Sequence, residues 1–116
     1  MQKVLINAET ADKTSDGFSV EHHTNLVAQL IRADHTSGNT VFSFDGSNDG
    51  TNWVVGIAVL NVVATAIGTY VLSVTLSSAT TAAVYIPAGW KMIRAVADVT
   101  TDGTNTVILT GQTIRG

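Results

Sequence analysis

The sequence predicts an all-β protein, an antiparallel β-sandwich or jelly roll of about eight strands. Short runs rich in valine, isoleucine, threonine and aromatic residues are separated by clusters of Gly, Asn, Asp and Ser, which is the pattern of strands and turns. Within many runs the apolar residues alternate with polar ones, the period of a strand. No stretch combines a helical period with a cap and a stop signal. Evenly spaced short strands are typical of sandwiches and jelly rolls.

The first expected strand covers residues 2–7, and a polar segment follows at 8–17. Alternation over 18–34 predicts a second strand with apolar groups on both faces. A turn cluster at 34–39 then leads into a strand at 40–44.

Residues 45–53 read DGSNDGTNW and form the strongest turn signal in the chain. The glycines carry no Cβ, and Asn and Asp tolerate left-handed backbone angles. Because apolar, β-branched or aromatic runs flank this segment at 41–44 and 54–55, it predicts a hairpin loop that fixes the register of two strands.

Beyond this loop, alternation predicts a strand at 53–60, and the pattern at 62–68 is ambiguous. The clean alternation of 70–76 predicts one half-buried strand. A small-residue connection at 77–83 precedes a short apolar run and a Pro-Ala-Gly turn. The last third predicts a second hairpin, with 90–100 and 105–114 flanking a turn.

The length of 116 residues predicts a single domain over 1–116, with 1–17 as a candidate extended N-terminal arm. A net charge of -3 argues against a nucleic-acid partner. Only 13% of residues are charged, against about 25% in an average domain, so we expect other protein to cover much of the surface. The chain has no cysteine, which excludes disulfides and thiolate metal sites.

Neither export nor membrane insertion is expected. Only three apolar residues follow Lys3 before polar ones, too few for a signal peptide, so we expect synthesis in a cytoplasm. The uncharged stretch at 53–68 is shorter than the ~20 residues of a spanning helix and is interrupted by polar residues and glycine. No membrane contact is therefore predicted.

No catalytic, cofactor or metal site is predicted. The segment 45–50 matches the first half of a calcium loop, but position twelve is Gly56 where a carboxylate is required. His22 and His23 are adjacent and point to opposite strand faces, so metal binding there would need several chains meeting on a trimer axis. The chain has no Gly-x-Ser-x-Gly elbow and no glycine-rich phosphate loop before a helix, so we expect no enzyme.

The candidate binding residues are polar side chains of the 45–53 loop and two tryptophans beside turns: Asp45, Asn48, Asp49, Asn52, Trp53 and Trp90. The structural alternative is that the loop side chains bond the turn backbone and that the tryptophans pack at the ends of the sandwich. Arg94 lies between apolar neighbours, and we expect it to reach solvent or to pair with Asp98 on the same face.

The segments 42–53, 91–96 and 107–111 together resemble small β-sandwich proteins of tailed phages that decorate or cement capsids. The same skeleton is similar to part of the discoidin-type galactose-binding jelly roll, although this chain lacks that family's longer N-terminal half and its ligand-binding spikes. The phage resemblance implies a virion structural protein on the capsid surface, with the major capsid protein as partner and a symmetric homo-oligomer, a trimer first.

Two other functions remain open from the sequence. A carbohydrate- or receptor-binding module of a tail fibre would use Trp53, Trp90 and the loop 45–52 as its ligand face. Another head or tail structural component is the third interpretation.

Overall fold

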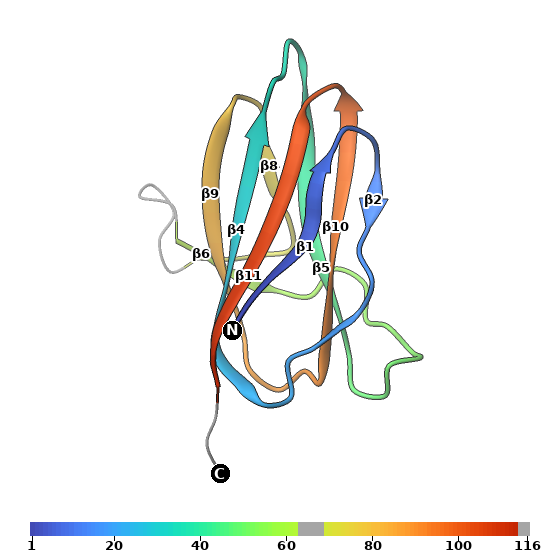
Figure 1. The fold of residues 1–116 in the computed structure, drawn as a ribbon, viewed down its shortest axis with the longest axis vertical. Helices are drawn as coiled ribbons and strands as arrows, with labels where there is room; N and C mark the ends of the chain where they lie inside the picture. The colour runs from blue at the N-terminus through green and yellow to red at the C-terminus, as the bar shows by residue number, and fades with distance from the viewer. Residues whose placement is uncertain (63–68, 114–116) are drawn as a thin grey trace.

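The computed structural model describes residues 1–62 and 69–113, and within them the chain forms eleven β-strands in two sheets that pack as a sandwich (Figure 1). The larger sheet has six strands, in the spatial order β1 (Gln2–Glu9), β11 (Thr104–Thr113), β4 (His23–Ala33), β9 (Thr80–Ile86), β6 (Val59–Asn61) and β7 (Thr69–Val71). The smaller sheet has five, in the order β2 (Lys13–Thr14), β10 (Met92–Thr101), β5 (Gly38–Ser47) and β8 (Val74–Leu76), with β3 (Phe18–Ser19) also paired to β10.

Eight of these strands have jelly-roll order. The set β1-β11-β4-β9 faces the set β2-β10-β5-β8, and all pairs are antiparallel. This arrangement confirms the predicted all-β sandwich, with β3, β6 and β7 as short additions. The first 17 residues include β1 and β2, which pair with β11 and β10.

Inward-facing side chains of both sheets make one core. Every second residue is buried over much of β4, β9, β10 and β11; in β4, Leu26, Ala28 and Leu30 are covered and the residues between them are more exposed. The other buried apolar side chains are Ile6, Val20, Phe42, Phe44, Ile57, Val59, Leu76, Ala82, Val84, Ile86, Ile93, Ala95, Ala97, Val107 and Leu109.

Successive long strands lie in opposite sheets. β10 pairs with β5 and β11 pairs with β4, so the turn between β10 and β11 crosses from one sheet to the other (Figure 1). The expected hairpin between 90–100 and 105–114 is therefore wrong, and residue 114 lies outside the described residues. A tight turn reverses the chain in a hairpin and in a crossover alike, so the turn residues could not distinguish the two.

The middle of the chain also departs from expectation. After the 45–53 loop, a single bridge between Gly46 and Val54 replaces the expected strand at 53–60, and the chain then crosses to the larger sheet as β6. The expected strand at 70–76 is two strands, β7 and β8, in different sheets. Leu72 lies at the break and is 65% exposed, although the alternation assigned it to the same side as the buried Leu76.

Candidate functional site

The 45–53 loop is organised around the carboxylate of Asp49. The backbone N–H groups of Thr51 and Asn52 donate to its Oδ1 at 2.8 and 2.7 Å, and the side-chain amide of Asn52 donates to Oδ2 at 2.7 Å. The hydroxyl of Ser47 donates to Oδ1 at 3.1 Å. These bonds, led by the backbone N–H of Asn52, lower the pKa of Asp49. The loop side chains thus bond the turn backbone, the structural alternative of the sequence analysis.

Asp45, the first residue of this segment, is buried and bound to Arg94. The two residues face each other on β5 and β10, and Arg94 Nε donates to Asp45 Oδ2 at 2.8 Å. The backbone N–H of Gly56 donates to Oδ1 at 3.1 Å. Arg94 therefore pairs with Asp45 and not with the expected Asp98, which lies four positions away, about 13 Å along the strand.

The two tryptophans lie on opposite sides of the smaller sheet. The ring of Trp53 lies 4.4 Å from the guanidinium carbon of Arg94, on the outer side. Trp90 packs against the core and covers Gly46, where an added Cβ would come within 2.4 Å of its ring. The structure therefore brings Asp45 and Trp53 together through Arg94 and separates Trp90 from them.

Asn48, the remaining candidate binding residue, accepts a hydrogen bond from the backbone N–H of Lys91 at 3.0 Å. It also lies in a shallow depression with Asp49, Glu21 and Met92. Ligand binding by the loop and the tryptophans stays a prediction. Most polar side-chain atoms of the candidate residues already form hydrogen bonds within the chain.

Within residues 1–62 and 69–113, the structure holds no cluster of three or more His, Asp or Glu side chains placed to bind a metal ion. The same residues include no helix with the length and apolar character to span a membrane.

Among the described residues, the outer face of the larger sheet carries no charged side chain from Thr106 to Gln112 of β11 and its neighbours; at the end of the face Thr104 donates a hydrogen bond to the carboxylate of Asp34. Its cross-strand rows are set by the register: one row runs through Gln2, Thr110, Val27 and Tyr85 to Leu60 and Tyr70, and another through Val4, Ile108, Gln29 and Ala83. We call this surface the uncharged face, and it consists of Gln2, Val4, Asn25, Val27, Gln29, Ile31, Leu60, Tyr70, Thr81, Ala83, Tyr85, Thr106, Ile108, Thr110 and Gln112.

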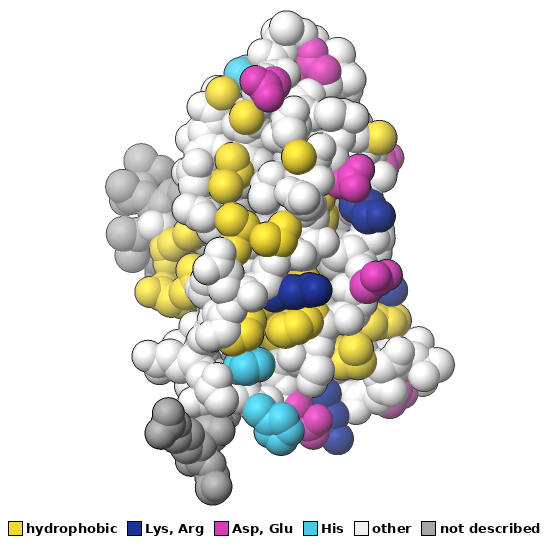
Figure 2. All heavy atoms as spheres, viewed as in Figure 1, with side chains coloured by type: hydrophobic (Ala, Val, Ile, Leu, Met, Phe, Trp, Pro, Cys, Tyr) yellow, Lys and Arg dark blue, Asp and Glu magenta, His cyan; other side chains and the backbone are white. Residues whose placement is uncertain are grey.

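The outer face of the smaller sheet differs, because Asp45, Arg94 and Asp98 lie on it. Figure 2 looks onto the larger sheet: the area over β9, β4 and β11 is hydrophobic or neutral, and charged side chains gather toward β1 and β2 and at the two ends. One feature of the sequence indicated an apolar outer surface: the 18–34 segment carries apolar residues on both of its sides.

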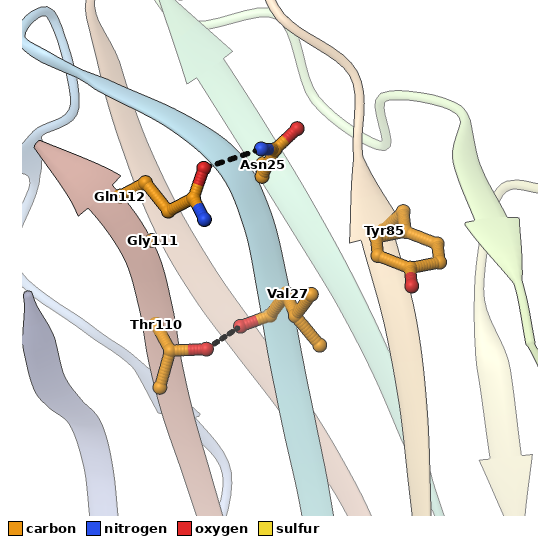
Figure 3. A pocket seen from close by; sticks show the side chains of 6 residues that line it. All are labelled: Asn25, Val27, Tyr85, Thr110, Gly111 and Gln112. Carbon is orange, nitrogen blue, oxygen red and sulfur yellow. Dashed lines mark hydrogen bonds between the residues drawn. The ribbon is translucent and has the colours of Figure 1, made fainter. Parts of the chain in front are cut away.

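One end of the uncharged face is hollowed into an open groove of about 580 Å³. Figure 3 shows its lining: the half-exposed ring of Tyr85 on β9, and Asn25 and Gln112 whose side-chain amides are joined at 2.7 Å. Two backbone irregularities place these amides, a positive φ of 53° at Asn25 and a register shift in β11 between Thr110 and Gln112. No local sequence pattern indicates this groove, because its residues come from three separate strands.

The fold and this surface define a class: a single jelly-roll domain with one broad, uncharged sheet face. Among solved structures, the chain is similar to the crystal structure of the SPBc2 prophage-derived protein YomS, with a TM-score of 0.70 and 12% sequence identity over 97% of this chain and 92% of that one. At this identity the likeness shows a shared fold alone. No protein-family model matches the sequence, and no curated protein matches it significantly.

Proposed function

We propose that the chain is a non-enzymatic virion structural protein of a tailed phage, which decorates or cements the capsid surface through contacts with the major capsid protein and with copies of itself. The observation that carries the proposal is the uncharged face. It exposes apolar side chains such as Val4 and Tyr85, at 42% and 47%, on a threonine-rich sheet. Such a surface favours association and is normally covered in an assembly.

Two further points support a virion role. The structural neighbour YomS is named as prophage-derived, and its fold matches this chain over nearly its whole length. Jelly rolls are also a recurring fold of viral capsid proteins. On a shell, many copies bind neighbouring sites, so contacts that are weak singly add avidity.

The test is binding to capsids of the encoding phage from which this protein has been omitted. We expect saturable co-sedimentation with those capsids and a rise in the temperature at which they lose their DNA. Capsids of an unrelated phage serve as the control and should bind nothing. Absence of binding at micromolar protein, with no change in capsid stability, would contradict the proposal.

The groove favours one other function, a carbohydrate- or receptor-binding module of a tail fibre. A half-exposed tyrosine ring beside side-chain amides is a surface on which a neutral sugar can stack and hydrogen-bond. A glycan array on the free protein separates the two functions. Saturable sugar binding that is lost in Tyr85→Ala would favour the groove, and tryptophan quenching lost in Trp53→Phe would favour the 45–53 loop instead.

A further inference from the structure

We infer that the uncharged face is covered by the same face of a second copy of this chain, in a dimer with two-fold symmetry. The inference rests on the proposed function and deepens it, because it names the partner of the surface that carries the proposal.

The first step is charge complementarity. A charged side chain buried against a neutral surface loses its water without gaining a partner, which is unfavourable. The described part of the chain has one broad neutral face, and its other sheet face exposes Asp98 and part of Arg94, whose partner Asp45 is buried. The uncharged face is therefore a better partner for its own copy than that second face is. Its Thr, Gln and Asn side chains both donate and accept hydrogen bonds, so they can pair with identical groups.

The second step is size. Four strands of the face, β1, β11, β4 and β9, run about seven residues or more, and β6 and β7 have three residues each, so at about 4.8 Å per strand and 3.3 Å per residue the flat area is on the order of 500 Å². Two such faces together cover about 1,000 Å², which is the lower bound of a specific protein interface. Two such faces can pack as sheets do in a sandwich, about 10 Å apart with their strands turned by about 30°.

The third step is symmetry. A face that meets its own copy produces a closed two-fold pair, whereas a trimer needs two different patches that fit each other. Three large hydrophobic residues of the described chain are strongly exposed outside this face: Val54, Val55 and Leu72, at 53%, 75% and 65%. They lie outside the named strands and are too few to complement a face of six strands. The geometry thus favours a dimer over the trimer that the phage resemblance implies.

Substitutions at the face test this arrangement directly. Gln29 lies mid-row between Ile108 and Ala83, so Gln29→Glu adds a charge to the face with little change of shape. Thr110→Lys adds a longer charged side chain near the groove. Thr75→Lys is the matched control, because Thr75 is also an exposed strand threonine but lies beside Val41 in the smaller sheet.

The experiment is size-exclusion chromatography with light scattering, followed by sedimentation equilibrium, on the full chain and the three variants. We expect a wild-type mass twice the 12.1 kDa of the chain. Gln29→Glu and Thr110→Lys should each raise the dimer dissociation constant at least tenfold, and Thr75→Lys should leave it unchanged. Far-ultraviolet circular dichroism verifies that each variant is folded.

Three results would overturn the inference: a wild-type monomer at high micromolar concentration, a three-chain mass, or a dimer that both face variants leave intact. Capsid binding is scored separately. A monomer that binds capsids would refute the dimer and leave the proposed function standing. A dimer that does not bind capsids would refute the proposed function and leave the dimer standing.

Discussion

Arg32 and Asp102 join the two turns at one end of the sandwich. Arg32 Nη2 donates to the backbone carbonyl of Asp102 at 2.8 Å and lies 3.9 Å from its carboxylate. The same guanidinium donates to the carbonyls of Ser37, Gly38 and Leu76 at 3.1 to 3.2 Å. One fully buried side chain of β4 therefore links the β4–β5 turn, the β10–β11 turn and β8.

We expect Arg32→Met to lower the free energy of unfolding by about 3 to 5 kcal/mol. The variant leaves the backbone carbonyls of Ser37, Gly38, Leu76 and Asp102 without the guanidinium that donates to them. Removing the donor of a buried polar network costs about 3 to 5 kcal/mol. Urea denaturation followed by circular dichroism measures the change. Arg32→Lys is the matched variant and should lose less, because it keeps a charge that can donate. A loss below about 1 kcal/mol for Arg32→Met would show that water replaces the guanidinium without penalty.

The sequence could predict the fold class because its signals are local. Alternation and turn residues act within a few positions, and they identified the strands around 26–31, 40–44 and 93–99. Arg32 is a case that local signals do not explain. The alternation places it on the inward side of the strand with Leu30, where a charged side chain is unexpected. Its partners are carbonyls of turns that are distant in the sequence, such as that of Asp102.

The candidate site could be predicted only in part for the same reason. The loop's internal hydrogen bonds followed from its Asn, Asp and Gly content, as Asp49 illustrates. The partner of Arg94 depended on the β5–β10 register, which no local pattern contains, so Asp98 was expected where Asp45 is found. The uncharged face required the order of six strands to be known.

Gly46 is expected to be sensitive to a single methyl group. A Cβ there would meet the Trp90 ring at 2.4 Å, so Gly46→Ala must displace the ring, at a cost of about 1 to 3 kcal/mol. In a Trp90→Ala background the same change should cost much less, because the obstacle is gone. A double-mutant cycle by urea denaturation measures this coupling. Equal costs in both backgrounds would mean that Trp90 is not what excludes the methyl group.

Arg94→Met should destabilise the protein by about 2 to 3 kcal/mol, because it leaves the carboxylate of Asp45 buried at 3% exposure without its cation. It should also change the fluorescence of Trp53, whose ring the guanidinium covers. Lys91→Met is the control: the Lys91–Glu21 pair is 58% and 50% exposed, and its loss should cost less than about 1 kcal/mol. Similar losses in both variants would argue that burial of Asp45 does not set the cost.

Acid should weaken the loops at both ends of the sandwich through Asp49 and Asp102. Hydrogen bonds lower the pKa of each carboxyl, that of Asp102 chiefly through the hydroxyl and backbone N–H of Thr36. A pKa that is lower in the folded state stabilises the fold above the unfolded value of about 3.9, and this contribution is lost as the pH falls through the folded pKa.

Asp49→Asn and Asp102→Asn should therefore destabilise the protein at pH 7, and their deficits relative to wild type should shrink steadily below about pH 4. Urea midpoints measured from pH 7 to pH 2 test this. Thr36→Val removes the hydroxyl donor and should reproduce part of the pH dependence of Asp102→Asn, since the backbone N–H groups of Thr36 and Ser37 still donate to the carboxylate. Deficits that stay constant down to pH 2 would show that these carboxylates act by geometry and not by charge.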